Sequence, residues 1–520
     1  MPARSWSGPT VAEAIDPIEL QVMIGGLHAA CEEMGAALIR SAYSANIKER
    51  RDCSTALFDE RGELVMQAEH IPVHLGSMPD AVAAVLAEEQ RPDRSWILND
   101  PFRGGTHLPD ITLITPVFAA GEQIGFAACR AHHADVGGPT PGSMPARSRS
   151  LEEEGVIVPP TEAGPEQLAE LAGRMRFPAQ RLADLRAQAA ANRVGVGRLI
   201  ELLERHGRER LGAAMAEILA YAERRTRAAL ADLPDGSYAA EDVLEDDAWG
   251  NPRDLRLRVE ARVEGERLTL DFTGTDSEVE GNLNCPLSVT KSAAFFAVRA
   301  LTDPDAPPSA GAFRPIEVIA PEGCLLNARP PAAVVAGNTE TSSRVADLVF
   351  AALGGARSVP AQGQGTMNNL TLANEDFTYY ETLGGGQGAC PDGDGPSAIH
   401  VAMSNTLNTP VEALETEFPL RVRELAIRRG SGGSGDHDGG DGVVREIEAL
   451  APMTYSLIGE RRRHRPRGRD GGEDGAAGRN SVDGESVGGK AEGTLEAGDR
   501  LRIETPGGGG LGRDRLEKGA

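Results

Sequence analysis

The chain has 520 residues, and its 53 Lys and Arg residues against 78 Asp and Glu residues give a formal net charge of −25. This acidic balance argues against nucleic-acid binding and against attachment to an anionic membrane surface, because both need a basic footprint. With 40% hydrophobic and 25% charged residues, the composition is that of a globular protein with a sizeable core.

No targeting or membrane-spanning segment is recognisable from the sequence pattern. The first residues, MPARSWSGPTVAEAIDP, lack the apolar stretch of a signal peptide. No run approaches roughly 18 uninterrupted apolar residues. The six cysteines are scattered and form no C-x-x-C pair. This pattern indicates reduced thiols, so we expect a cytoplasmic protein.

Residues 16–69 predict a long helix followed by a β-hairpin. Asp16 can cap the helix, Pro17 suits its first position, and apolar residues from Leu20 to Leu38 recur at steps of three and four. The segments CSTALF and ELVMQA then read as two strands joined by a turn at 59–62.

The whole chain predicts an α+β fold with large, mixed but mainly antiparallel β-sheets. We expect four regions: an α+β region at 1–160 that holds the reactive side chains described below, a helical segment at 161–235, a central α+β region at 236–430, and a Gly-rich β region at 431–520.

Helical patterns and Gly runs mark further features within these regions. Helices are predicted at 162–232, with breaks near Pro178 and around 195–197, and again at 286–302 and 342–354. The Gly runs at 384–388 and 507–510 have no adjacent Lys of the phosphate-binding kind, so we interpret them as flexible β-loops.

The densest group of reactive side chains lies between residues 100 and 138. Residues 111–118 and 124–131 each read as a strand, and the five-residue connection AAGEQ predicts a hairpin between them. If Ile111 pairs with Ala131, the start of the first strand meets the end of the second strand.

This register brings side chains with metal-binding chemistry together. Asp110 is expected opposite His132, and His107 opposite Asp135. Directly paired Cβ atoms lie roughly 5 Å apart. Imidazole and carboxylate together suit Mn, Fe, Zn, Co or Ni, and the absence of thiolate argues against a closed structural zinc site. Pro109 places the first pair on a loop, where substrate can reach a metal.

The adjacent His132 and His133 point to opposite faces of an extended chain, so only one of them is expected to be a ligand. The hairpin register favours His132, whereas a one-residue slip would select His133. In the segment NIKERRD at 46–52, Glu49 or Asp52 can complete the coordination, although the spacing alone favours a solvated charge run.

Other polar residues are weaker candidates for the same site. His70 and His74 are separated by Pro72, which disfavours a helical metal pair, yet either can line the site. Four arginines are candidates for binding an anionic group. The alternative is that each forms an ordinary surface salt bridge. These are Arg50, Arg51, Arg103 and Arg130. Polar residues at 338–340 and 368–369 can line a cavity or simply form turns.

Several motifs resemble the hydantoinase B/5-oxoprolinase family. They are NIKERRDCSTALFDERGELVMQAEHIPVHLGSM, DPFRGGTHLPDITLITPVF, RAHHADVGG, EEGVIVPPT, NTPVEALETEFPLRVRELAIRRGSGGSG, VVREIEALAP and TPGGGGLG. They occur in order from about Asp16 to about Gly512, so the resemblance covers nearly the whole chain.

The resemblance implies a protein partner and a metal. Family members are hydantoinase B-type polypeptides, or the matching half of a fused chain, that work with a hydantoinase A-type polypeptide, which binds ATP in an actin/Hsp70-like fold. They include ATP-dependent 5-oxoprolinases, N-methylhydantoinases and ketone carboxylases. We therefore expect a hetero-oligomer in which the partner handles ATP and Mg, and this chain has no G-x-x-x-x-G-K-[ST] motif of its own.

In the carboxylases of this family a divalent metal is held by a Glu and by His/Asp motifs. Carried over to this sequence, the resemblance implies that Glu49, His107, Asp110 and His132 hold Mn, Fe or Zn. The implied reaction is the opening of a five-membered lactam or imide of the 5-oxoproline or hydantoin type. The partner would phosphorylate the ring amide oxygen, and His133 or Asp135 would hold or deprotonate the attacking water.

Three other functions remain open at this point. The chain can be the metal-binding component of an ATP-dependent ketone carboxylase, in which an enolate attacks carboxyphosphate. It can be a non-catalytic scaffold that only stabilises its A-type partner. It can also be a stand-alone metallohydrolase that needs no ATP.

Overall fold

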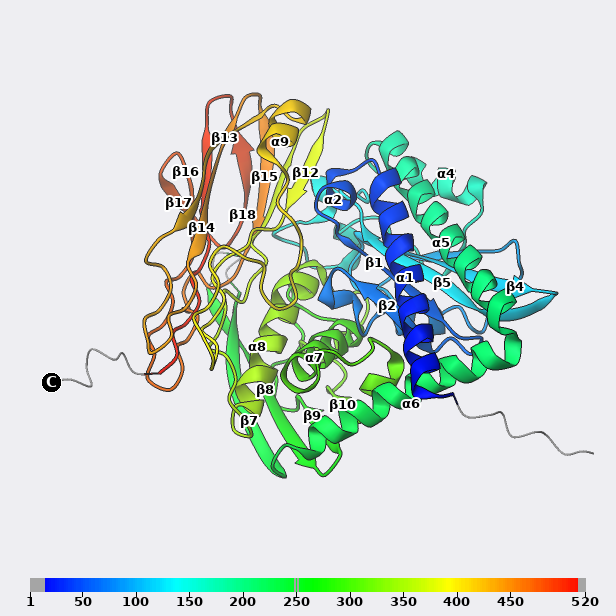
Figure 1. Ribbon diagram of the computed structural model, residues 1–520. Coiled ribbons are helices and arrows are strands. Elements are labelled where there is room, and N and C mark those ends of the chain that lie inside the picture. The colour runs from blue at the N-terminus through cyan, green and yellow to red at the C-terminus, as the bar shows by residue number, and fades with distance from the viewer. Residues whose placement is uncertain (1–14, 247–248, 250–251, 513–520) are drawn as a thin grey trace, which may run out of the picture.

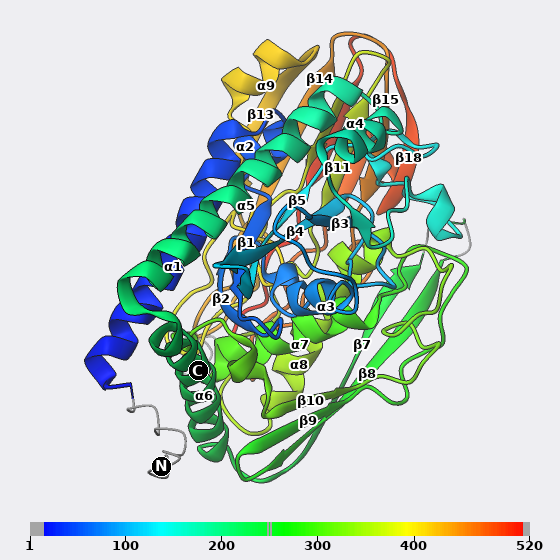
Figure 2. The same cartoon turned by 90° about the vertical axis from the view of Figure 1, so that its right-hand side faces the viewer.

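The computed structural model describes residues 15–246, 249 and 252–512 (Figures 1 and 2). Its first layer is a six-stranded sheet in the order β2-β1-β5-β4-β3-β6, in which every neighbouring pair is antiparallel. The strands are β1 (Cys53–Phe58), β2 (Leu64–Glu69), β3 (Trp96–Leu98), β4 (Asp110–Ala119), β5 (Glu122–His132) and β6 (Thr161–Glu162). The hairpin predicted at the start of the chain is thus confirmed as β1–β2.

Helices α1 (Pro17–Ser41) and α5 (Pro178–His206) lie side by side against this sheet (Figures 1 and 2). Asp16 caps α1 as predicted, because its carboxylate accepts hydrogen bonds from the backbone N–H groups of Ile18 and Glu19. Helices α4 (Pro165–Gly173) and α6 (Arg208–Ala231) complete this helical layer, and α2 (Ala45–Lys48) and α3 (Met78–Ala83) are short.

By length and composition alone, α1 could cross a membrane. In the structure one face of this helix lies in the core, whereas Ile18 and Val22 are exposed. Leu27 and Met34 are fully buried and belong to the same core cluster as Leu199 of α5 and Ile218 of α6. The helix therefore packs as the core helix of a globular protein does.

Helix α5 runs unbroken through residues 195–197, where the sequence predicted a break. A side chain on Gly195 would collide with the sulfur of Met34 on α1, so this glycine permits close helix packing and does not mark a turn. The break comes instead at Gly207, whose φ of 77° separates α5 from α6. The break predicted near Pro178 is confirmed, because α5 begins there.

The second sheet has the order β10-β9-β8-β7, and only β10 and β9 pair in parallel. Its strands are β7 (Gly236–Asp246), β8 (Arg253–Glu264), β9 (Arg267–Asp271) and β10 (Ile316–Ile319). Alternate residues of β8 are buried, as expected for a sheet with one face in the core. Helices α7 (Leu287–Thr302) and α8 (Ser342–Leu353), both predicted, share that core.

Two further antiparallel sheets pack against each other at the C-terminal end (Figure 1). Their orders are β12-β11-β15-β18 and β13-β14-β19-β16-β17. The strands are β11 (Asn369–Ala373), β12 (Thr378–Glu381), β13 (Leu420–Arg428), β14 (Gly442–Ala449), β15 (Met453–Ile458), β16 (Arg479–Val482), β17 (Glu485–Val487), β18 (Lys490–Leu495) and β19 (Arg500–Glu504), and α9 is Val411–Glu417. The α+β class with mainly antiparallel sheets is confirmed, and both of these sheets contain strands from before and after residue 430.

The Gly runs are packed segments and not flexible loops, which corrects the prediction. Residues 507–510 are buried and hydrogen-bond through their backbones to other Gly-rich segments: Gly508 N–H donates to Gly440 O at 2.9 Å, and Gly433 N–H donates to Gly508 O at 2.9 Å. A Cβ on Gly386 would run into the carbonyl oxygen of Gly440. Glycine is needed here because backbones approach each other directly.

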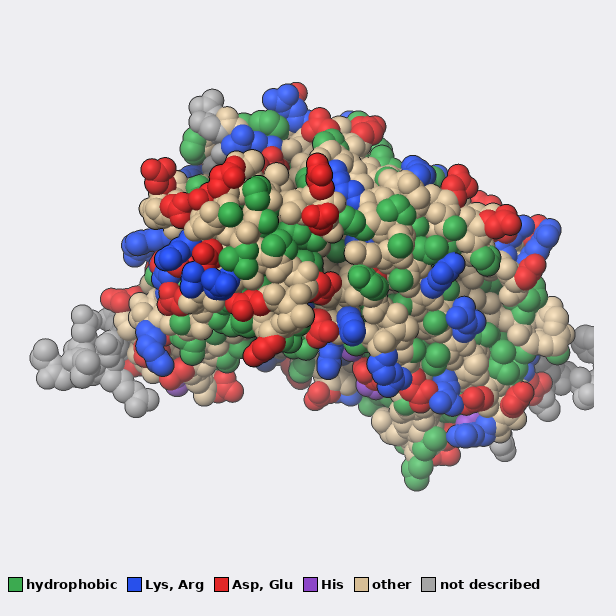
Figure 3. Space-filling model, turned by 90° about the horizontal axis from the view of Figure 1, so that it is seen from above, with side chains coloured by type: hydrophobic (Ala, Val, Ile, Leu, Met, Phe, Trp, Pro, Cys, Tyr) green, Lys and Arg blue, Asp and Glu red, His purple; other side chains and the backbone are tan. Residues whose placement is uncertain are grey.

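Charged side chains are interspersed on the surface and paired in the interior. Acidic and basic groups are mixed on the face shown in Figure 3. Inside, Lys490 of β18 lies 2.7 Å from the carboxylate of Glu460, and Arg344 of α8 lies 3.5 Å from the same carboxylate. These buried pairs connect α8, which packs on the second sheet, to the C-terminal sheets.

Candidate metal centre

The β4–β5 hairpin has the register predicted from the sequence. Ile111 pairs with Ala131, and Asp110 pairs with His132 at the end of the hairpin. The preceding loop closes on itself, because Asp110 N–H donates to His107 O at 3.1 Å. Local strand pairing and one tight turn therefore bring these three side chains together.

His107, Asp110 and His132 form a group that can hold a metal ion. One ligand atom from each residue lies within 4.8 Å of the other two, and all three side chains are buried. His107 Nε2 lies 3.2 Å from Asp110 Oδ2. Two imidazoles and a carboxylate are the donor set of many catalytic metal sites with open positions.

The hydrogen bonding of this group fits a cation held between its members. Both ring nitrogens of His107, Nε2 of His132 and Oδ1 of Asp110 are buried without a hydrogen-bond partner in the described part of the chain. Unpaired buried polar atoms are costly, and a cation bound between one donor atom of each side chain would give such atoms a partner. Nδ1 of His132 already pairs with the side-chain amide of Asn46 at 3.0 Å, which orients the ring.

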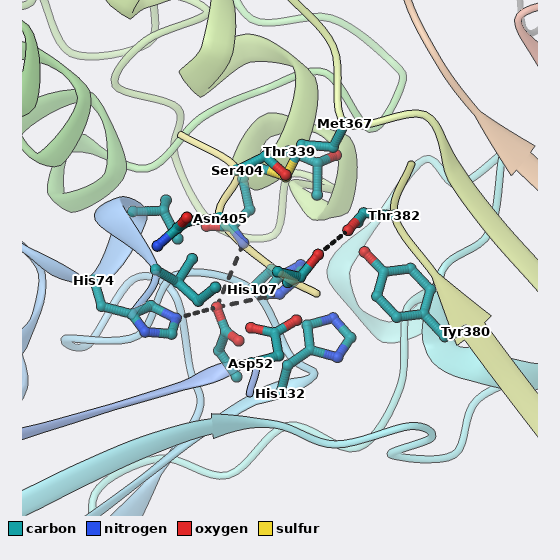
Figure 4. Close-up of a pocket in the computed structure, with 15 residues that line it drawn as sticks. Asp52, His74, His107, His132, Thr339, Met367, Tyr380, Thr382, Ser404 and Asn405 are labelled. Carbon is teal, nitrogen blue, oxygen red and sulfur yellow. Dashed lines mark hydrogen bonds and ion pairs between the residues drawn. The ribbon is translucent and has the colours of Figure 1, made fainter. Parts of the chain in front are cut away.

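Asp52 and His74 line the same cavity beside this group (Figure 4). His74 links two strands of the site, because its Nδ1 lies 2.9 Å from Ser54 Oγ and its Nε2 lies 3.4 Å from Asp110 Oδ2. The sequence left open whether His74 lines the site, and the structure places it there.

Burial and neighbouring charges set the protonation of the group. Burial alone would raise the pKa of Asp110, but nearby His107 and His74 outweigh it and hold that pKa well below its usual value. Burial, with His107 close by, lowers the pKa of His132 well below its usual value. A carboxylate beside neutral imidazole is the state that metal binding requires. Burial and the Asp110 charge raise the pKa of Asp52 to about 7.

The cavity itself is small. The space open to water centres is about 20 Å³, which is enough for one or two water molecules. One side is formed by residues 399–409, called here the covering segment, which contributes Ser404 and Asn405 (Figure 4). Asn405 donates a side-chain hydrogen bond to His70 O at 2.7 Å, and Leu407 N–H donates to Arg50 O at 3.1 Å.

Glu49, which the family resemblance implied as a ligand, lies outside this group. It is half-buried at the end of α2 and does not line the cavity. The chain then turns at Arg51, whose φ is 57°, and it is Asp52 that faces inward. The nearby negative charge of Glu49 helps to raise the pKa of Glu417 on α9, after burial, which places Glu49 on the α9 side.

His133 and Asp135, predicted to handle the attacking water, also lie elsewhere. His133 points to the other face of the hairpin, as the alternation predicted, and its Nε2 lies 2.9 Å from Gln188 Oε1 on α5. Strand β5 ends at His132, so the register does not continue to Asp135. That carboxylate accepts hydrogen bonds from the N–H groups of Gly137 and Gly142 and from Arg176. The expected approach of Asp135 to His107 was therefore wrong.

The arginines considered for gripping an anion do not line the cavity within the described chain. Arg50 is buried, and its guanidinium donates to Tyr380 O, Thr382 Oγ1 and Thr406 Oγ1. Arg130 donates to Thr112 Oγ1, Ser77 Oγ and Gly104 O. Arg51 and Arg103 are exposed. Both buried guanidinium groups act as structural braces around the site.

Residues far along the sequence complete the cavity. Asn338 and Thr339, which the sequence analysis singled out as polar positions, line it from a π-helical turn at Gly337–Thr341. Tyr380 of β12 stacks on His132, with ring centroids 4.6 Å apart and planes 7° apart. No signal in the sequence singles out Tyr380, because the contact joins strands of two sheets that lie some hundreds of residues apart in the sequence.

Comparison with known proteins gives consistent matches. Residues 16–514 match the family described as hydantoinase B/oxoprolinase. Over 97% of its own length, this chain is 39% identical to a 5-oxoprolinase of Dictyostelium discoideum. Over 96% of its own length, it is 38% identical to an uncharacterised protein of Methanocaldococcus jannaschii. It spans 41% of the first protein and 91% of the second, so it covers about two fifths of the curated 5-oxoprolinases it matches.

Two solved structures share the fold. The ATP-dependent caprolactamase from Pseudomonas jessenii superposes with a TM-score of 0.88 at 27% identity, covering 97% of this chain and 93% of that one. A nucleotide-free acetone carboxylase gives a TM-score of 0.87 at 18% identity, covering 96% and 77%, and shows the fold alone. The family match across nearly all residues and these relatives lead to one conclusion: this chain belongs to the hydantoinase B/oxoprolinase family.

Proposed function

We propose that this chain carries the metal site of an ATP-dependent cyclic amidohydrolase that opens a five-membered lactam or imide, of the 5-oxoproline or hydantoin type. The observation that carries the proposal is the convergence of His107, Asp110 and His132 with their unpartnered ligand atoms. The names of the relatives, 5-oxoprolinase and ATP-dependent caprolactamase, support cyclic amide hydrolysis as the reaction.

ATP and Mg would be handled by a hydantoinase A-type partner in a hetero-oligomer. The 5-oxoprolinases matched here are much longer than this chain, which leaves room in them for a second catalytic half. A further relative, from a Pseudomonas species, is named as one of the subunits of a D-/L-hydantoinase, and such a name implies that another polypeptide completes that enzyme. The six cysteines form no disulfide in the described chain, which suits the reducing cytoplasm that we propose as the location.

The residues that line the cavity have different roles in this proposal. His107, Asp110 and His132 would hold Mn, Fe or Zn, and His74 would fix the Asp110 carboxylate through its 3.4 Å contact. A divalent ion held there would act as a Lewis acid and make water nucleophilic near neutral pH. Asp52 replaces His133 and Asp135 as the group that takes the proton of that water, because its carboxyl lines the same cavity. The walls exclude bulk solvent during the attack.

The test reconstitutes the chain with its A-type partner, ATP, Mg and one of Mn, Fe or Zn. We expect ring opening of 5-oxoproline or a hydantoin, and its loss to background in Asp110→Ala with the fold retained by circular dichroism. Normal turnover in this variant would refute the proposal. Incorporation of labelled bicarbonate into a ketone would instead establish a carboxylase, and turnover without ATP or partner a stand-alone hydrolase. A chain that retains no metal would support the scaffold.

A further inference from the structure

One wall of the cavity, beside the metal-binding group, is fixed by hydrogen bonds that the proposed reaction does not use. Tyr380 lies on this wall, and its hydroxyl end is turned toward the cavity (Figure 4). The hydroxyl donates a hydrogen bond to Asn369 Oδ1 at 2.8 Å. Tyr380 therefore has a defined direction for its only polar proton.

The direction of this hydrogen bond follows from the partners of Asn369. The Asn369 amide nitrogen donates to Glu340 Oε1 and to the backbone carbonyl of Ile458, each at 2.8 Å. A backbone carbonyl can only accept, so this side of the amide must be the NH₂ group. The amide oxygen therefore faces Tyr380, whose hydroxyl must donate to it. The phenol oxygen has only lone pairs left for other partners, so it can only accept hydrogen bonds from a ligand in the cavity.

Asn338 offers a second acceptor in the same way. Its amide nitrogen lies 3.4 Å from Asp110 Oδ2, and its buried Oδ1 has no hydrogen-bond partner in the described part of the chain. The amide cannot turn over without placing its oxygen against the Asp110 carboxylate. No Lys or Arg lines the cavity among the described residues. Tyr380 and Asn338 thus present acceptors to a cavity that no cationic Lys or Arg lines in the described chain, which suits a ligand that brings N–H groups.

We propose that the phenol oxygen of Tyr380 accepts a hydrogen bond from the ring N–H of the cyclic amide and makes the site specific for an unsubstituted ring nitrogen. This inference rests on the proposed function for the class of ligand. Phosphorylation of the ring oxygen leaves the N–H in place on a protonated ring nitrogen, and ring opening also leaves an N–H, so the same acceptor serves the activated ring and the product. Stacking on His132 holds the phenol ring 4.6 Å from an imidazole of the metal-binding group, so a ring nitrogen bound to the phenol oxygen brings its carbonyl near that group.

The test measures binding, so it does not depend on turnover. The full chain with added Mn²⁺ is titrated with 2-pyrrolidone and with N-methyl-2-pyrrolidone, which lacks the N–H. We expect the wild type to prefer 2-pyrrolidone, and Tyr380→Phe to weaken 2-pyrrolidone binding about five- to tenfold while leaving the N-methyl compound unchanged. Phenylalanine keeps the stacking on His132, so only the oxygen is removed.

Tyr379→Phe is the matched control, because Tyr379 points from the same strand into the core between the C-terminal sheets. It should keep the preference of the wild type. Equal affinities in the wild type, an unchanged preference in Tyr380→Phe, or binding of neither compound would overturn the inference. A chain that shows the preference but opens no cyclic amide with its partner would overturn the proposed function and leave this inference standing.

Discussion

His132 and His133 are neighbours in the sequence and yet face different environments. His132 joins the metal-binding group, whereas His133 hydrogen-bonds to Gln188 on α5. Alternation along a strand is sufficient to predict this difference, once the register is known. The position of Asp135 was not predictable in the same way, because β5 ends at His132 and the chain then leaves the predicted register.

The two histidines provide a matched pair of variants. We expect His132→Ala to lose bound metal, because one of three ligands is gone, and His133→Gln to retain it. Metal content after dialysis, measured by inductively coupled plasma mass spectrometry, checks this expectation. Equal metal loss in both variants, or none in either, would contradict the assignment.

Glu154 makes the stability of the protein depend on pH. Burial raises its pKa to about 7 from an ordinary value near 4.5, although it accepts hydrogen bonds from Val334 and Val335 N–H and from Ser148. In the folded state the carboxyl keeps its proton to higher pH than in the unfolded state. Its contribution to stability is therefore fully present below pH 4.5 and is lost as the pH rises through about 7.

We expect Glu154→Gln to remove this loss. The free energy of unfolding of the wild type should fall by up to about 3 kcal/mol more than that of the variant between pH 4.5 and 7. Urea unfolding at several pH values measures the two slopes. Parallel pH profiles would show that Glu154 does not titrate in this range.

At the scale of elements, local pairing was predictable and backbone packing was not. The β4–β5 register follows from strand lengths and one short connection. The Gly runs carry the composition of loops, but their buried glycines sit where another backbone passes. Composition cannot distinguish a glycine that permits bending from one that permits contact. The same ambiguity explains the break wrongly expected at Gly195 of α5.

Substitutions at two glycines can distinguish a glycine that permits close backbone contact from one that does not. Gly386→Ala should destabilise the fold by at least about 2 kcal/mol, because its Cβ would meet the Gly440 carbonyl. Gly393→Ala should change stability by less than about 1 kcal/mol, because nothing lies within 4 Å of its Cβ position. Thermal unfolding of both variants decides the point, and similar melting temperatures would argue against backbone packing as the role of Gly386.

At the scale of the whole molecule, the site joins pieces that no local pattern links. The hairpin supplies Asp110 and His132, the turn before α8 supplies Asn338, and β12 supplies Tyr380. The sequence therefore predicted that His107, Asp110 and His132 lie together, but not the wall beside them. Asp52 rather than Glu49 reaches the cavity because of the backbone turn at Arg51, a detail that spacing does not encode.

The covering segment has a consequence for how a ligand reaches the cavity. A space for one or two water molecules cannot admit a ring of five atoms, so the proposed reaction requires this cavity to widen. We expect residues 399–409 to be the part that moves, which requires the hydrogen bonds of Asn405 to His70 and of Thr406 and Leu407 to Arg50 to break. Their amide hydrogens should exchange with deuterium faster than those of β11 and slow down when a cyclic amide is bound. Protection equal to that of β11 in the free chain would place the entrance elsewhere.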